Sequence, residues 1–312
     1  MNMDNRIKPP KLNPGDEIRV IAPASAPDMI KLSRGIARLK KLGYKVTVGK
    51  NIKKLNQRND LAAPAKDRAE ELMSAFKDDN VKAIFCARGG YGSIHILSLL
   101  DYETIREHPK IFMGYSDITA LHLAINRNSN MITFHGPMVA SDVDDISKPS
   151  FKEFLEILSG KSDEINIYRD RLIKYIIPGT TEGCSMGTNI SLVASLLGTN
   201  FIPDTAGKIF FIEDTDVTSG DIDRYFFSMK LANIIEQFNG FVFGDFKAIF
   251  DREEPMPSIE DVVQKFMNEI NKPSLYGAPF GHGEEQMVLP LNAKMKISDE
   301  EPYMELKENV VD

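Results

Sequence analysis

The 312-residue chain is predicted to be an α/β protein, with an N-terminal domain built on a parallel sheet flanked by helices and a mixed α+β C-terminal domain. Three observations favour this fold. The length suits one large domain or two of ordinary size. Short apolar runs alternate with helical patterns through the first half. A more polar stretch covers residues 140–180, so we place the domains at 1–165 and 166–312 with a linker between them.

The first half predicts four strands and four helices in alternation. In the first helix Ile30, Leu32, Ile36 and Leu39 recur close to helical spacing, and Gly43 ends it as a left-handed C-terminal glycine. The predicted strands are 17–22, 45–48, 81–86 and 110–113, and the predicted helices are 29–42, 65–76, 93–100 and 118–125. Ligands of such sheets bind beyond the carboxyl ends of the strands.

The second half has less regular signals. A surface helix is predicted over 151–158 within the linker. The remaining predicted helices are 191–197, 221–238 and 259–270, and the predicted strands are 208–212, 240–243 and short ones around Leu275 and Met295.

Composition excludes several classes of protein. A net charge of −7 argues against a nucleic-acid surface, which needs clustered Lys and Arg, although it leaves anionic small substrates open. The two cysteines, Cys86 and Cys184, are too few for a disulfide framework and lack zinc spacing. No stretch is apolar enough to span a bilayer, and the start shows no secretory leader, so we expect a cytoplasmic protein without membrane association.

The strongest local signal for chemistry is the segment Met113-Gly114-Tyr115-Ser116-Asp117-Ile118-Thr119. A predicted strand delivers Ser116 to a sharp turn and a helix follows at once, as in the turn that exposes a nucleophilic serine above an α/β sheet. The pattern differs from GxSxG, because Ile118 stands in place of the second glycine. The alternative is that Ser116 or Asp117 only caps the helix.

A nucleophilic serine needs a base and an orienting carboxylate. Among five histidines, His282 lies between two glycines at a strand end, and His135 follows a strand and either lines a site or makes a structural hydrogen bond. The carboxylate is Glu213 or Asp214, both at the end of a predicted strand.

The glycine-rich segment Arg88-Gly89-Gly90-Tyr91-Gly92 follows a predicted strand but lacks the spacing of a dinucleotide fingerprint. It suits a loop whose backbone approaches a ligand, with Arg88 near a substrate carboxylate. The alternative is a tight turn in which the arginine caps carbonyls. No phosphate-binding loop or HExxH zinc motif is present.

Several of these segments, in this order, resemble the S66 serine peptidases, the LD-carboxypeptidases. The resemblance covers residues 15–298. It rests on 88–92, 113–121, His135-Gly136-Pro137, Ile212-Glu213-Asp214, Phe243-Gly244-Asp245-Phe246, Phe280-Gly281-His282 and Leu289-Pro290-Leu291.

The resemblance implies a catalytic triad of Ser116 as nucleophile, His282 as general base and acid, and Glu213 as orienting carboxylate. It also implies an oxyanion hole of backbone N–H groups, for which we select Gly90 and Asp117. Arg88 or Tyr91 is then expected to bind the terminal carboxylate of the substrate.

The expected reaction removes terminal D-Ala from a peptidoglycan tetrapeptide (a muropeptide) at an L,D peptide bond during cell-wall recycling. No cofactor and no metal are expected, and the family resemblance implies a homodimer.

The chain departs from the usual family pattern at Gly187-Thr188-Asn189, at Gln286, at Asn292 and over 215–219, which puts the shape of the substrate pocket in doubt. Two other functions stay open. A related hydrolase acts on microcin C-like aminoacyl-nucleotides, but the intact 88–92 loop and the absence of tryptophan disfavour it. A non-catalytic peptide binder would not need all three triad residues.

Overall fold

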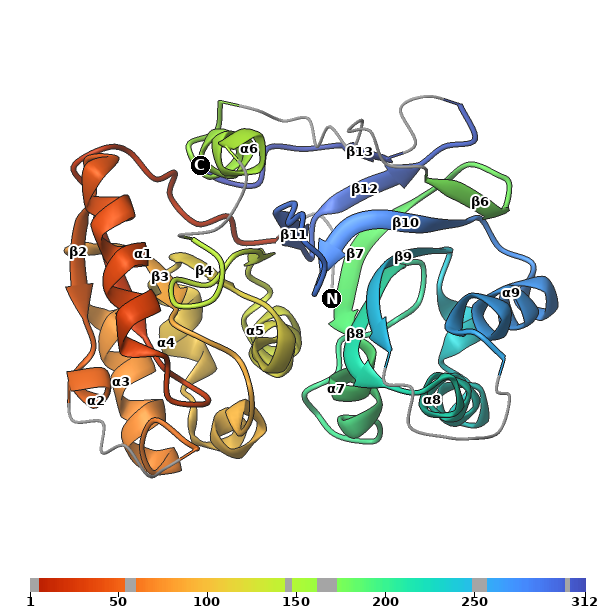
Figure 1. Cartoon of the computed structure of the whole chain (residues 1–312), viewed down its shortest axis with the longest axis horizontal. Coiled ribbons are helices and arrows are strands. Elements are labelled where there is room, and N and C mark those ends of the chain that lie inside the picture. The colour runs from red at the N-terminus through yellow and green to blue at the C-terminus, as the bar shows by residue number, and fades with distance from the viewer. Residues whose placement is uncertain (1–5, 54–59, 144–147, 162–172, 249–256, 301–303) are drawn as a thin grey trace.

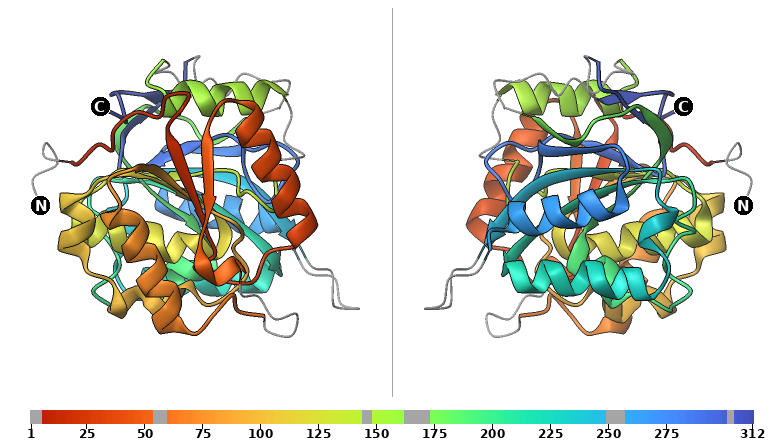
Figure 2. Two further views of the ribbon diagram at one scale, coloured as in Figure 1. Left: turned by 90° about the vertical axis from the view of Figure 1, so that its left-hand side faces the viewer. Right: turned by 90° about the vertical axis from the view of Figure 1, so that its right-hand side faces the viewer.

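The computed structural model describes residues 6–53, 60–143, 148–161, 173–248, 257–300 and 304–312 (Figure 1). Two sheets, one in each half of the chain, lie next to each other and carry helices on their faces (Figures 1 and 2). Parallel strands flanked by helices in the first half and a mixed sheet in the second confirm the predicted fold class. The predicted boundary after residue 165 lies outside the described residues.

The N-terminal sheet has six strands in the order β11-β5-β4-β3-β1-β2. Five are parallel, as βα alternation requires, and only β11 runs antiparallel to its neighbour β5. The strands are β1 (Glu17–Ile21), β2 (Lys45–Val48), β3 (Val81–Cys86), β4 (Ile111–Gly114), β5 (Thr133–His135) and β11 (Leu289–Leu291).

The four helices predicted in this half are present, with one difference in type. The predicted helix over 93–100 is a 3₁₀ helix, η1 (Ser93–Leu99), held between left-handed Gly92 and extended Leu100. The other helices are α1 (Met29–Lys41), α2 (Lys50–Lys53), α3 (Ala65–Lys77), α4 (Tyr102–Glu107), η2 (Ser116–Ile118) and α5 (Thr119–Ser129). The short helices α2 and α4 were not predicted.

The C-terminal sheet has seven strands in the order β13-β12-β7-β8-β9-β10-β6. The four central strands are parallel and the outer three antiparallel, so the sheet is mixed as predicted. The strands are β6 (Lys174–Ile177), β7 (Thr181–Asn189), β8 (Ile209–Val217), β9 (Gly240–Ala248), β10 (Ser274–Gly281), β12 (Lys294–Ile297) and β13 (Met304–Leu306).

The single long helix predicted over 221–238 is wrong. Thr218 caps the helix and forms a capping box with Asp221, so α8 begins at Ser219 and ends at Leu231. Asn233 then adopts a left-handed conformation (φ 54°), which stops the helix before the short η3 (Ile235–Gln237). The remaining helices are α6 (Lys148–Leu158), α7 (Ile190–Ser195) and α9 (Ile259–Ile270).

Helix α6 is not simply a surface helix, as the sequence predicted. Phe154, Ile157 and Leu158 are buried and join the core together with Val310 and Val311 at the C-terminus. Figure 1 shows α6 beside the C-terminal end of the chain. The helix is therefore a packed part of the structure.

The two halves share their cores. Strand β11 belongs by sequence to the C-terminal half but pairs with β5 of the N-terminal sheet. Both hydrophobic clusters of the core draw residues from both halves, and alternate residues of β8 point into each: Phe211 into one cluster, Phe210 and Ile212 into the other. This seam between the sheets is consequently a packed interior. None of the described helices is both long and apolar enough to cross a membrane.

If β11 ties the halves together, Leu291→Ala should lower the free energy of unfolding by about 2–5 kcal/mol, because Leu291 is fully buried and its truncation leaves a cavity. The matched control is Leu231→Ala on α8, where the side chain is 76% exposed and the change should cost less than about 0.5 kcal/mol. Urea unfolding of the three proteins measures both values. Equal unfolding midpoints for the two variants would contradict the role given to β11.

Candidate active site

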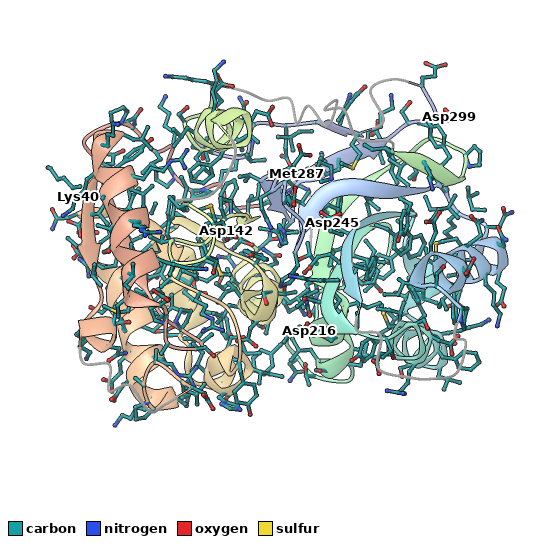
Figure 3. All side chains as sticks on the ribbon, viewed as in Figure 1. Lys40, Asp142, Asp216, Asp245, Met287 and Asp299 are labelled. Atoms are coloured by element: carbon teal, nitrogen blue, oxygen red, sulfur yellow. The ribbon has the colours of Figure 1, made fainter. Side chains whose placement is uncertain are left out.

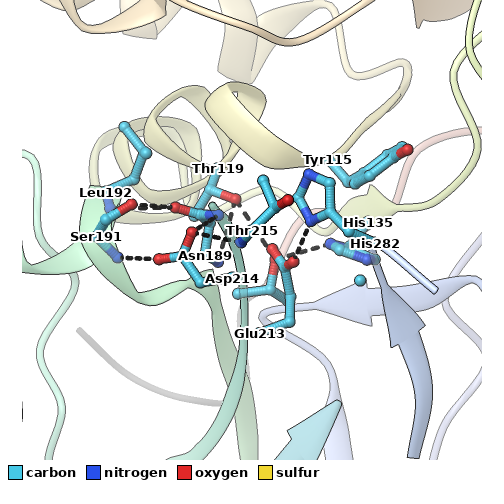
Figure 4. Close-up of polar contacts among 12 residues, drawn as sticks. Tyr115, Thr119, His135, Asn189, Ser191, Leu192, Glu213, Asp214, Thr215 and His282 are labelled. Carbon is cyan, nitrogen blue, oxygen red and sulfur yellow. Dashed lines mark hydrogen bonds and ion pairs between the residues drawn. The ribbon is translucent and has the colours of Figure 1, made fainter. Parts of the chain in front are cut away.

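Glu213 and His282 come from different strands and contact each other at the seam, where Tyr115, the residue before Ser116, packs on His282 (Figure 4). Ser116 follows the carboxyl end of β4, and His282 follows the carboxyl end of β10. Glu213 lies within β8, which continues to Val217, so its predicted place at the strand end is wrong. The site occupies the edge at which ligands of parallel sheets usually bind.

Ser116 sits at a strained turn. Its φ of 62° lies in the left-handed region, which non-glycine residues rarely adopt. Gly89 packs directly on this turn, since a Cβ on Gly89 would lie 3.0 Å from the Ser116 Cβ. Neither η2 nor α5 has a side-chain cap, so the alternative of Ser116 as a helix cap is wrong. The serine is half-buried.

Asp117 does not cap the helix either. Its carboxylate accepts a hydrogen bond from the Ser93 N–H at 2.8 Å, and its carbonyl accepts one from the Ser93 hydroxyl. These bonds fix the loop 88–92 against the serine turn. Burial raises the pKa of Asp117, and the bonds from Ser93 oppose that rise.

A short hydrogen bond joins His282 to Glu213. The His282 Nδ1 and the Glu213 Oε2 lie 2.6 Å apart, and the Glu213 side chain is completely buried. Gly281 makes this approach possible, because a Cβ there would lie 2.7 Å from the Glu213 Cβ. A glycine is also required by its φ of 109°. Gln286 donates an amide hydrogen bond to the Gly281 carbonyl and so holds the same turn.

The environment favours the protonated form of His282. Burial alone would lower the pKa of His282, but its hydrogen bond to Glu213 and the nearby carboxylates outweigh burial and raise that pKa. The carboxylates are Glu213, Asp214 and Asp142. For Glu213, burial raises the pKa, and the hydrogen bond and charge of His282 oppose the rise. A buried carboxylate that faces an imidazole is suited to fix its tautomer and stabilise its cation.

Asp214, the other carboxylate that the sequence left open, belongs to a separate network (Figure 4). Successive strand residues point to opposite faces, so Asp214 faces away from His282. It accepts hydrogen bonds from the Asn189 side chain at 2.9 Å and from the N–H groups of Ser191 and Thr215. Asp214 thereby anchors the start of α7 and the β8 backbone next to Glu213.

Tyr115 connects the serine turn to both histidines of the seam. Its ring centroid lies 5.1 Å from that of His282 and 5.6 Å from that of His135. Its hydroxyl donates to Asp142 at 3.0 Å. Burial, followed by the charge of Asp142, raises the pKa of Tyr115, so the hydroxyl stays a donor. The sequence analysis assigned no role to Tyr115 or to Asp142. The one available signal was the position of Tyr115 directly before Ser116.

His135 has a structural bond, one of the two alternatives left open. It is fully buried and shares a 2.7 Å hydrogen bond with the Thr188 hydroxyl across the seam. Burial lowers the pKa of His135 well below its ordinary value. Thr188, one of the positions at which the sequence departs from the family pattern, is therefore bonded to His135 inside the seam. Its neighbour Asn189 caps α7.

The loop 88–92 forms the rim of the site. Arg88 and Tyr91 are both exposed; Arg88 donates to the Ala26 carbonyl at 3.3 Å, and Tyr91 contacts His95. The Gly90 N–H belongs to the peptide bond that follows Gly89, the residue packed on Ser116. In the part of the chain that the structure describes, no hydrogen bond occupies the N–H of Gly90 or Asp117. The described residues contain no cluster of three or more metal-ligating side chains.

The two halves match two family profiles. Residues 18–136 match the LD-carboxypeptidase N-terminal domain, and residues 182–297 match the LD-carboxypeptidase C-terminal domain. The chain belongs to the LD-carboxypeptidase family. It is therefore a hydrolase, as the resemblance of its motifs predicted.

Individual relatives support this assignment. The chain is 39% identical to the probable murein peptide carboxypeptidase of Bacillus subtilis (strain 168), over 94% of this chain and 92% of that protein. It is 26% identical to the microcin C7 self-immunity protein MccF of Escherichia coli, over 88% of each.

Two solved structures share the fold. MccF without ligand superposes with a TM-score of 0.88 at 23% identity, over 98% of this chain and all of that one. Muramoyltetrapeptide carboxypeptidase from Oxalobacter formigenes gives 0.77 at 24% identity, over 92% of this chain and 96% of that one.

The Glu213–His282 contact gives a pKa prediction. Glu213→Gln removes the charge that raises the pKa of His282 while burial remains, so that pKa should fall. The control is Asp216→Asn, an exposed residue of the same strand whose left-handed conformation (φ 57°) asparagine also tolerates. NMR titration of the His282 ring protons, assigned with a His282→Gln variant, measures the change. An unchanged pKa in Glu213→Gln would refute the electrostatic coupling.

Proposed function

We propose that this protein is a serine-type LD-carboxypeptidase that removes terminal D-Ala from peptidoglycan tetrapeptides during cell-wall recycling. One observation carries the proposal: a buried Glu213–His282 hydrogen bond lies next to the strained turn of Ser116 in a chain of this family. The substrate class is supported by the 39% identity to a probable murein peptide carboxypeptidase over nearly the full length.

In the proposed reaction, Ser116 attacks the carbonyl carbon of the L-configured residue before D-Ala. His282 takes the hydroxyl proton and then gives it to the leaving nitrogen as the C–N bond breaks. Water, activated by the same histidine, hydrolyses the acyl-enzyme and restores Ser116. Glu213 stabilises the imidazolium that forms in each half of the reaction. The Ser116–His282 hydrogen bond forms once substrate fills the site, as is common for catalytic contacts.

The oxyanion hole is proposed to consist of the backbone N–H groups of Gly90 and Asp117. Both flank Ser116, and both are without an intramolecular acceptor in the described structure. Preorganised donors of this kind contribute about 10²–10³ to kcat each. The bond between Ser93 and Asp117 holds the two donor segments together.

Arg88 and Tyr91 are proposed to bind the terminal carboxylate of the substrate, because both are exposed at the rim beside Gly90. The Arg88 bond to the Ala26 carbonyl is long, at 3.3 Å, and leaves most of its guanidinium donors available.

The proposal includes a cytoplasmic homodimer that needs no cofactor and no metal, with the nucleophile in domain 1–165 and the acid–base pair in domain 166–312. The placement of Ser116 in the N-terminal half and of Glu213 and His282 in the other half supports this division.

A second function, hydrolysis of microcin C-like aminoacyl-nucleotides, is favoured by the 26% identity to the microcin C7 self-immunity protein. Such an enzyme would use the same serine on a different acyl compound. The two functions are distinguished by substrate, and a non-catalytic binder would turn over neither.

The deciding experiment incubates wild-type protein and Ser116→Ala with L-Ala-γ-D-Glu-meso-diaminopimelate-D-Ala and follows the products by mass spectrometry. Wild type should release one alanine, and Ser116→Ala should lose at least about three orders of magnitude in rate, because the attacking oxygen is gone. Ser228→Ala removes a hydroxyl of α8 that donates to the Arg224 carbonyl of the same helix, and it serves as the control that retains nucleophile, base and oxyanion hole.

If the tetrapeptide stays intact and the protein cleaves an aminoacyl sulfamoyl adenosine instead, the first function is wrong and the second is supported. Equal turnover by wild type and Ser116→Ala would refute Ser116 as the nucleophile.

A further inference from the structure

A pocket lined by charged and polar side chains as well as apolar surface lies at the seam, and none of the proposed catalytic residues line it. It has a volume of about 70 Å³ and draws its lining from both halves of the chain. Residues 6, 126, 127 and 130 come from the N-terminal half, and residues 184, 203, 204, 206, 208 and 292 come from the C-terminal half. Its charged residues are Arg6, Arg127, Lys208 and Asp204.

Arg6 is a buried cation of this pocket. Its side chain is only 6% exposed, and it forms an ion pair with Glu308 at 2.8 Å. One guanidinium nitrogen, Nη1, contacts the Cys184 sulfur, while the buried Nε has no partner. Such an unpaired buried donor carries a desolvation cost that an anion in the pocket would remove.

Lys208 has fewer hydrogen-bond partners than Arg6. Its ammonium group has three donors but makes one hydrogen bond, 3.3 Å long, to the neutral Asn292 side chain. Within the described residues it forms no ion pair. Burial lowers the pKa of Lys208; Cys184 and Asp204 oppose that fall, and the charges of Arg6 and Arg127 add to it.

The acidic residue of the lining does not neutralise these cations. Asp204 is exposed, and its carboxylate accepts a hydrogen bond from the N–H of Ala206 in its own turn. Arg127 is also exposed and has no partner among the described residues. With Glu308 assigned to Arg6, the pocket keeps two cations, Arg127 and Lys208, against Asp204 alone.

We propose that this pocket binds a small oxyanion, such as phosphate or a carboxylate, between the two halves of the protein. The pocket is small, so it suits a compact group such as phosphate or a carboxylate rather than a nucleotide or a peptide. Arg and Lys donors supply charge-assisted hydrogen bonds to such a group.

The position of the pocket gives the anion a structural role. Arg6 precedes the backbone bridge between Ile7 and Met131, which fastens the N-terminal segment beside α5. Lys208 precedes β8, the strand that carries Glu213, and Asn292 lies between β11 and β12. A bound oxyanion would therefore hold together the segments that join the two sheets, and it should stabilise the folded protein.

The test is thermal unfolding of the full-length protein in increasing sodium phosphate, with sodium chloride at matched ionic strength as reference. At about ten times Kd, phosphate should raise Tm by about 2 °C or more beyond chloride. Isothermal titration calorimetry with phosphate should give one site per chain. Parallel titrations with sodium acetate show whether the pocket prefers a tetrahedral oxyanion or a carboxylate.

Lys208→Met should abolish the anion-dependent rise in Tm, and the control Lys230→Met, on the surface of α8, should keep it. Arg127→Ala removes an exposed side chain, so it tests the site even where Lys208→Met does not fold; it should weaken phosphate binding at least fivefold. Equal Tm in phosphate and chloride for wild type, or unchanged phosphate binding in Lys208→Met or Arg127→Ala, would overturn the proposal.

Discussion

The hydrogen bond between Glu213 and His282 is the contact on which the site depends. A fully buried carboxylate is costly unless a positive or donating partner faces it, and His282 supplies that partner at Glu213 Oε2. That requirement fixes the turn after β10, where glycine at position 281 allows the backbone to approach the carboxylate. It also raises the pKa of His282 despite burial, as the proposed role of His282 as a general base requires.

The pair is useful only if the seam between the sheets is rigid, because Ser116 comes from the other half. Three kinds of contact supply this rigidity. Strand β11 extends the N-terminal sheet with residues from the C-terminal half. Thr188 bonds to His135 across the seam, and Tyr115 packs against both His135 and His282. Asp142, which accepts the hydrogen bond of the Tyr115 hydroxyl, lies on the N-terminal side of the middle of the molecule, and Asp245 lies on the C-terminal side (Figure 3).

Much of this arrangement could be predicted from the sequence. Alternating apolar runs and helical patterns predict a parallel sheet, and the motifs at the strand ends mark the edge of the sheet at which ligands bind. Ser116 was singled out by a turn between strand and helix. The choice between Glu213 and Asp214 depended on which face of β8 meets His282, which is a tertiary fact that the family resemblance supplied. The prediction of one helix over 221–238 was wrong because Asn233 adopts a left-handed conformation that ends the helix. The residues around Asn233 give no sequence signal for that conformation. The buried face of α6 was missed because its partners, Val310 and Val311, lie more than 150 residues further along the chain.

The most direct test of the account is the rate at which a fluorophosphonate labels Ser116, measured by peptide mass spectrometry in wild type, Glu213→Gln and His282→Ala. The account requires rapid labelling of Ser116 in wild type, slower labelling in Glu213→Gln, and the slowest in His282→Ala, because the histidine activates the serine and the glutamate supports the histidine. Labelling of Ser116 at the same rate in all three proteins would contradict it.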